Sequence, residues 1–234
     1  MITYTKDLKE INKNSLPEAG GKGANLGELI HANIPVPPGF IVTTGAYRTH
    51  LEEAGLQERI ANRLVGLGEN DLSVIMKASD DISSWIEAVP MPATVREEVS
   101  RAYESLSLKT RPALPVAVRS SATAEDLPSV SFAGQHETYL GIQGQDAVLK
   151  HIKKCWASLW SAQAISYRIS NGFEHLKVEL AVVVQVMIAS EVAGVMFTAN
   201  PVNGKSDEIL ISAGYGLGET VVSGLITPNT FILY

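Results

Sequence analysis

Residues 115–141 constrain this chain most, because they place a cation and many small polar groups at the end of an apolar strand. The strand is predicted over residues 116–119 and ends in Arg119, and a second turn of small residues, 131–134, leads into another predicted strand at 137–142. The hydroxyl residues that follow Arg119 are Ser120, Ser121 and Thr123. Hydroxyls, backbone amides and a guanidinium together can bind the oxygens of a polyphosphate. In isolation a solvated polar loop would explain these residues better, so the phosphate interpretation depends on the rest of the chain.

A second candidate anion site lies at residues 20–23, Gly-Gly-Lys-Gly, where the chain enters a helical pattern. The first amides of a helix and its positive end favour an anion, and Lys22 adds a movable charge. The spacing is not that of a Walker A loop, which needs Gly-x4-Gly-Lys-Ser/Thr. Taken alone, a helix start with a solvated lysine is an equally good interpretation.

Gln185 interrupts an apolar strand predicted over residues 181–188. Its amide can donate and accept, so it could contact the edge of a purine, although a core strand with one satisfied amide is the stronger interpretation of this strand alone. Residues 214–218 contain three alternating glycines. Their spacing departs from Gly-x-Gly-x-x-Gly, which excludes a Rossmann dinucleotide site.

The overall pattern predicts an α+β fold. Helices are expected over most of residues 45–109 and over 146–169, and further strands at 40–43, 194–198 and 208–211. The strands predict antiparallel hairpins and not one doubly wound sheet.

Prolines at residues 109–115 and a change of pattern predict a domain boundary there. We expect an N-terminal α/β lobe at 1–112, a small β-loop-β-α-β lobe at 113–189, and return strands at 190–234 that pack on the first lobe. This division predicts two lobes.

Composition excludes several classes of function. The 234 residues carry a net charge of −6, which argues against nucleic acid or an anionic membrane surface as the main partner. The single cysteine, Cys155, excludes an internal disulfide and a cysteine metal cage, and the five histidines show no ligand spacing, so we assign no metal ligand. No signal peptide or membrane-length apolar run is evident, which predicts a cytoplasmic protein.

Seven motifs in collinear order resemble the nucleotide-binding part of the phosphoenolpyruvate synthase family (pyruvate, water dikinases), which rifamycin phosphotransferases and pyruvate phosphate dikinases share. The motifs are GGKGANLGE at 20–28, VPPGF at 36–40, VAVRSSATAEDLP at 116–128, SFAGQ at 131–135, CWASL at 155–159, GVMFT at 194–198 and GLGET at 216–220. The resemblance extends over essentially the whole chain.

The resemblance implies an ATP-grasp fold, here incomplete, whose two lobes close on ATP. It implies that Lys22 and Arg119 bind the phosphates and serve as the catalytic residues. It also implies that Gly134 covers the phosphates through its backbone, that Thr138 adds a hydroxyl contact, and that Gln185 lies beside the adenine or ribose.

The resemblance further implies transfer of the β-phosphoryl of ATP to a histidine on a separate swivelling domain, and then to pyruvate on an acceptor-binding domain. Ligands for Mg²⁺ are expected beyond Tyr234, so this chain is expected to be inactive alone. Two alternatives remain: the ATP-binding domain of a rifamycin phosphotransferase, to which residues 197–201 and 221–225 are closer, and a nucleotide-binding module without phosphoryl transfer.

Overall fold

The computed structural model describes residues 3–68, 71–110, 114–123 and 137–234. The chain divides into two compact units, one up to Met187 and one from Ile188 to Tyr234. The described residues form both helices and strands, and the strands make two antiparallel sheets. This confirms the predicted α+β class. No helix in the described part of the chain is long and apolar enough to span a membrane.

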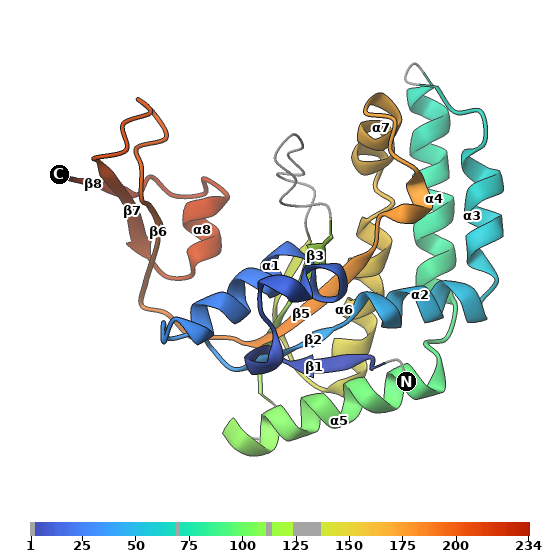
Figure 1. Cartoon of the computed structure of the whole chain (residues 1–234), viewed down its shortest axis with the longest axis horizontal. Coiled ribbons are helices and arrows are strands. Elements are labelled where there is room, and N and C mark those ends of the chain that lie inside the picture. Colours follow the sequence, from blue (N-terminus) through green and yellow to red (C-terminus); the bar gives the residue numbers. More distant parts are fainter. Residues whose placement is uncertain (1–2, 69–70, 111–113, 124–136) are drawn as a thin grey trace. The chain divides into compact units, whose positions relative to one another are not determined.

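A five-stranded sheet with the order β1-β2-β5-β3-β4 forms the centre of the first unit, and all its neighbouring strands are antiparallel (Figure 1). The strands are β1 (Thr5–Asp7), β2 (Gly39–Val42), β3 (Val116–Ala122), β4 (Thr138–Ile142) and β5 (Leu180–Val186). Most residues of β2, β3 and β5 are buried, because helices cover both faces of these central strands. Strand β3 extends three residues beyond its predicted end at Arg119.

More helices pack on one face of this sheet than on the other. Helix α1 lies in front of the sheet and α6 lies behind it in Figure 1. The helices of this unit are α1 (Leu16–His31), α2 (Thr44–Glu53), α3 (Leu56–Leu64), α4 (Leu72–Ala88), α5 (Ala93–Thr110), α6 (Gln145–Ser158) and α7 (Ala162–Ser170). A large core joins one face of the sheet to α2–α7, and a small core that includes Ala19, Ile41 and Val183 lies under α1. Far fewer apolar residues are therefore buried under α1 than on the other face of the sheet.

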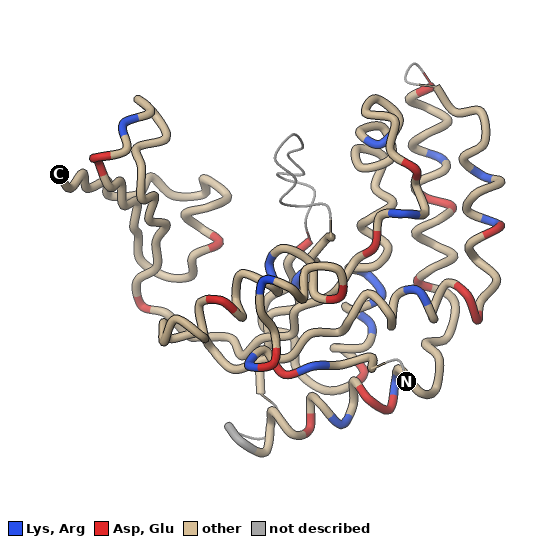
Figure 2. Tube along the Cα trace, in the orientation of Figure 1, with Lys and Arg blue, Asp and Glu red and all other residues tan. Residues whose placement is uncertain are grey.

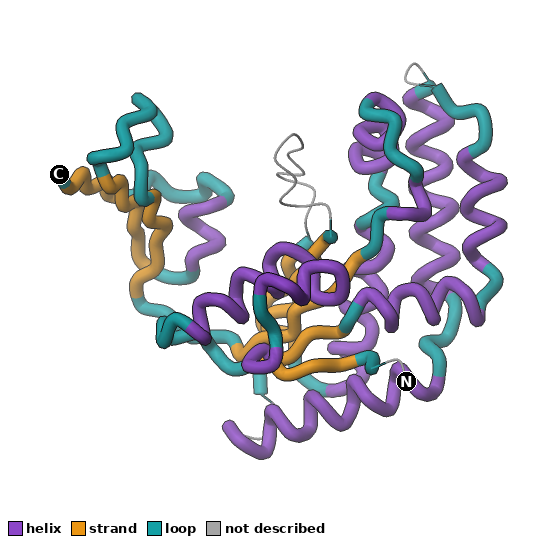
Figure 3. Tube along the Cα trace, viewed as in Figure 1, coloured by secondary structure: helices purple, strands orange, loops and turns teal. Residues whose placement is uncertain are grey.

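The helix predicted at 146–169 is two helices, α6 and α7, separated by residues 159–161 (Figure 3). Ser161 begins α7 as its N-cap, where its hydroxyl accepts a 3.2 Å hydrogen bond from the Ala164 amide. The apolar positions continue through the break, so helical periodicity alone does not show that two helices are present. The local pattern that indicates the start of the second helix is Ser161, a residue type that is common at N-caps.

The boundary predicted near residue 112 differs from the division in the structure. Strand β3 pairs with β5, and β5 pairs with β2, so strands from both sides of residue 112 share one sheet. The compact unit instead ends at Met187. Pro115 directly precedes β3 and lies within the first compact unit, not between two domains. The packing of residues 190–234 on the first lobe stays a prediction.

The second unit is a three-stranded antiparallel sheet of β6 (Val192–Phe197), β7 (Ile209–Tyr215) and β8 (Asn229–Leu233), with the short helix α8 (Gly218–Val222). In the loop before β7, the Glu208 carboxylate accepts hydrogen bonds from Lys205, Asn203 and Asn200 at 2.6–2.9 Å. These bonds, that of Lys205 first, lower the pKa of Glu208 to about 2. The loop is thus closed around one anionic side chain.

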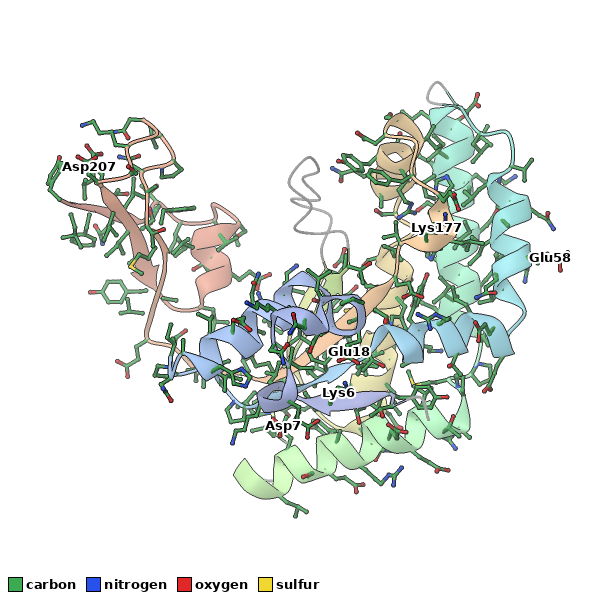
Figure 4. All side chains as sticks on the ribbon, viewed as in Figure 1. Lys6, Asp7, Glu18, Glu58, Lys177 and Asp207 are labelled. Carbon is green, nitrogen blue, oxygen red and sulfur yellow. The ribbon has the colours of Figure 1, made fainter. Side chains whose placement is uncertain are left out.

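Charged residues of both signs are interspersed along α3, α4 and α5 (Figure 2). Such residues occupy the solvent side of helices whose apolar positions enter the core. One ion pair ties β1 to α1: Lys6 Nζ lies 2.7 Å from Glu18 Oε1, and the two side chains point toward each other in Figure 4. An exposed pair of this kind adds little to stability but orients the start of α1.

Buried polar and aromatic side chains gather where α2, α6 and α7 meet. The fully buried Arg168 donates from Nε to Nδ1 of His175 at 3.1 Å and lies 4.9 Å from the ring centroid of Trp160. Burial and then the positive charge of Arg168 lower the pKa of His175 to about 4. Burial likewise lowers the pKa of His50, whose Nε2 donates to the Ile86 carbonyl at 3.0 Å. Both imidazoles are therefore neutral in the folded protein at pH 7.

We predict that the protein loses stability as the pH falls from about 6.5 to about 4. Both histidines bind protons more readily in the unfolded chain, so acid favours unfolding. After discounting for the partial exposure of His175, we expect a loss of roughly 1–3 kcal/mol. Urea unfolding at pH 7.0 and 5.0 measures it, and His175→Gln, which keeps an acceptor for Arg168, should reduce the loss. An unchanged pH dependence in His175→Gln would contradict this assignment.

Candidate functional site

The glycine turn (residues 20–23) lies at a break inside α1. Gly20 has φ 69° and ψ 174°, outside the helical region, so the helix up to Ala19 stops and a new helical segment starts at Gly21. Lys22 sits in the first turn of this second segment and is half-buried. The sequence-based prediction of a helix start beside Lys22 is confirmed, although α1 as a whole begins earlier, at Leu16.

Strand β3 contacts the glycine turn through Ser121. The Ser121 hydroxyl donates a 2.8 Å hydrogen bond to the Ala19 carbonyl and accepts a 3.1 Å hydrogen bond from the Gly23 amide. A Cβ on Gly20 would lie 2.1 Å from the backbone oxygen of Ser121, so this approach requires glycine. The two predicted phosphate-binding segments are therefore adjacent in the structure.

Strand register places Arg119 on the face of the sheet that α1 covers. In the β3–β5 pair Arg119 lies opposite Val183, which belongs to the small core with Ala19. Directly opposed residues share a face, and residues two apart on a strand do too, so Arg119 and Ser121 point to the same side. Arg119 is half-buried and therefore reachable from solvent.

Thr138 and Gln185 share this face. Thr138 is exposed and pairs directly with Arg119 in the β3–β4 ladder, where opposed Cβ atoms are about 5 Å apart. Gln185 lies two residues beyond Val183, roughly 7 Å along β5. Its side chain is mostly buried, and its Nε2 donates to the Pro37 carbonyl at 3.1 Å. Part of its hydrogen-bonding capacity is thus used to hold the chain before β2.

Lys22 is carried by α1, which covers this face of the sheet. Its neighbour Gly23 bonds through the backbone amide to Ser121 of β3, two residues from Arg119. Lys22 and Arg119 therefore belong to segments that are in direct contact.

The hydroxyls of the residues after Arg119 bond to backbone groups, whereas the sequence-based interpretation expected them to bind phosphate. Ser120 and Ser121 are fully buried, and the Ser120 hydroxyl donates to the Glu137 carbonyl at 3.3 Å. The Thr123 hydroxyl donates to the Glu179 carbonyl at 3.3 Å. The reason is that the strand continues to Ala122, so these small side chains serve packing and backbone satisfaction. Likewise the Gly23 amide, expected to be available to an anion, is occupied by Ser121.

Arg119, Thr138 and Gln185 therefore lie on one face of the sheet, and Lys22 belongs to the helix α1 that covers this face. Gly134 falls outside the described residues. Among the described residues no group of three or more His, Cys, Asp or Glu is placed to hold a metal ion. Sequence reasoning took Ser121 for a ligand-binding hydroxyl and missed its contact with the glycine turn. The one available signal was a glycine at a helix start, which has no side chain to cap the helix.

A family model described as the pyruvate phosphate dikinase AMP/ATP-binding domain matches residues 16–234. A phosphoenolpyruvate synthase of Pyrococcus furiosus is 43% identical over 98% of this chain and 32% of its own length. Probable phosphoenolpyruvate synthases of Methanocaldococcus jannaschii and Archaeoglobus fulgidus are each 48% identical, over 97% and 96% of this chain and 19% and 30% of their own lengths.

The chain thus spans between 19% and 32% of the length of these three relatives. The match covers the glycine turn, β3, β4 and β5, and so includes each described residue that the resemblance assigned to the site. The resemblance stated from the motifs is confirmed by this match. This chain belongs to the family of pyruvate phosphate dikinase AMP/ATP-binding domains.

Proposed function

We propose that this chain is the ATP-binding part of an AMP-forming dikinase that converts pyruvate, ATP and water into phosphoenolpyruvate, AMP and phosphate. The observation that carries the proposal is the Ser121 contact, which joins the helix start bearing Lys22 to the strand bearing Arg119. Two cations held on adjacent elements suit a chain of phosphates better than a single anion.

The role of each residue follows from its chemistry. Arg119 can bind phosphate oxygens through a planar, always charged guanidinium, and Lys22 can add a movable point charge. Thr138, exposed beside Arg119, can donate its hydroxyl to the same phosphates. Gln185 lies two residues beyond Val183 on β5, and its amide is suited to hydrogen-bond the adenine or ribose. Phosphoryl transfer depends mainly on positioning and charge neutralisation, which these groups can supply.

We propose an ATP-grasp arrangement in which this unit contributes one side of the nucleotide site. The Gly134 backbone would cover the phosphates, as the resemblance implies. The described residues hold no group of three or more His, Cys, Asp or Glu that could bind Mg²⁺. When bound, Mg²⁺ would neutralise phosphate charge during transfer. The histidine-bearing swivelling domain and the acceptor-binding domain are proposed to lie in the remainder of a longer protein.

Pyruvate is the acceptor that we favour over rifamycin. The relatives named above carry the name phosphoenolpyruvate synthase, at 43–48% identity. The motif Phe-Thr-Ala-Asn-Pro at residues 197–201 is closer to rifamycin phosphotransferases, but it begins at the last residue of β6 and continues into the next loop, far in sequence from Lys22 and Arg119. The nucleotide site alone does not distinguish the acceptors, so the relatives support this choice.

Arg119→Ala should weaken ATP binding about ten- to hundredfold and AMP binding much less, because the guanidinium is proposed to bind the phosphates that AMP lacks. Isothermal titration calorimetry with both nucleotides measures the two affinities. Arg101→Ala, which removes a cation from the exposed side of α5, is the matched control and should leave both unchanged. An equal loss for ATP and AMP in Arg119→Ala would rule out a phosphate contact.

The 234-residue chain should bind ATP weakly, with an affinity that changes less than about threefold between 5 mM MgCl₂ and 5 mM EDTA. The reason is the lack of a suitable metal-ligand cluster in the described residues. Calorimetry under the two conditions tests this. A tenfold or greater gain with Mg²⁺ would show that this chain holds metal ligands of its own and would refute the proposal on this point.

A further inference from the structure

The second helical segment of α1 lacks a capping side chain of its own. Its N-cap position is Gly20, whose backbone is non-helical and which carries no side chain. In most helices the N-cap side chain accepts a hydrogen bond from the amide two or three residues later, because the first amides have no partner inside the helix. The amide three residues after Gly20 is that of Gly23.

Ser121 supplies this missing cap from another part of the chain. Its hydroxyl accepts from the Gly23 amide at 3.1 Å, although the two residues are 98 positions apart. The same hydroxyl donates to the Ala19 carbonyl at 2.8 Å, which is the last residue before the break. One buried oxygen thus bonds to the backbone on both sides of Gly20.

The position of Lys22 relative to Arg119 depends on this hydroxyl. Lys22 lies next to Gly23, which Ser121 binds, and Arg119 lies two residues before Ser121 on the same face of β3. A phosphate chain that contacts both cations needs them at a defined separation. Ligand affinity rises when that separation is set before binding, because less conformational freedom is then lost.

We propose that Ser121 is a positioning residue for the phosphate site, acting through the first turn of the helix that carries Lys22. This inference rests on the proposed function and adds to it a residue that does not touch the nucleotide. Removing the hydroxyl should therefore weaken ATP and inorganic tripolyphosphate, whereas AMP should bind almost as before.

The test compares Ser121→Ala with Ser120→Ala in the 234-residue chain. Ser120 is an ideal matched control, because it is also fully buried, yet its hydroxyl contacts the Glu137 carbonyl, and the Ser120 amide also bonds to that carbonyl at 3.0 Å. We expect Ser121→Ala to weaken ATP and tripolyphosphate about five- to tenfold, as the loss of one cap suggests, and to change AMP less than twofold. Ser120→Ala should leave all three affinities within twofold.

A double-mutant cycle separates positioning from general destabilisation. If Ser121 acts through Lys22, then Lys22→Ala and the double variant Lys22→Ala/Ser121→Ala should bind ATP equally. The reason is that loss of the Ser121 hydroxyl cannot displace an ammonium group that is already absent. Additive losses, or equal losses for ATP and AMP, would overturn the inference. If Ser121→Ala does not fold, Ser121→Cys decides, since its sulfur is a weaker acceptor: a lower ATP-to-AMP affinity ratio supports the inference and an unchanged ratio refutes it.

Failure of this inference is distinguishable from failure of the proposed function. If Arg119→Ala and Lys22→Ala weaken ATP while Ser121→Ala does not, the nucleotide site stands and only the role of Ser121 is wrong. If the unmodified chain binds neither ATP nor tripolyphosphate at millimolar concentrations, the proposed function itself is wrong.

Discussion

The Ser121 hydroxyl, bonded to the backbone on both sides of the break at Gly20, is the interaction on which the geometry of the site depends. It exists only because three conditions meet. Gly20 takes a positive φ, no Cβ stands between α1 and β3, and the strand continues far enough to bring Ser121 to the helix. Lys22 and Arg119 are thus carried by α1 and β3, which contact each other through the uncharged Ser121 hydroxyl and the backbone of Ala19 and Gly23.

The two faces of the central sheet differ in how many apolar residues they bury. Toward α2–α7 it presents branched apolar residues that join a large core, and toward α1 it presents a smaller apolar patch with polar side chains around it. Alternation along β3 places Val116 and Val118 on the first face and Arg119 and Ser121 on the second. A buried strand can therefore stabilise the fold and position a cation at the same time.

Much of the fold and of the candidate site could be predicted because it follows from local patterns. Apolar runs located β2, β3, β5 and β7, and helical spacing located most helices. Predictions were wrong where a residue type has two common uses. Small hydroxyl residues after Arg119 were taken for a loop that faces a ligand, but they continue a buried strand. Prolines before β3 were taken for a domain boundary, but Pro115 lies within the first compact unit.

The sequence by itself determined the family, the α+β class and the two cations suited to phosphate, because motif order, periodicity and side-chain chemistry are written along the chain. Only the tertiary structure decided that Arg119, Thr138 and Gln185 share the sheet face that is covered by α1, the helix of Lys22. It also decided that Ser121 caps a helix 98 residues away in sequence. The physical reason is that strand register and the close approach of α1 to β3 arise from packing between distant segments, which no local pattern records.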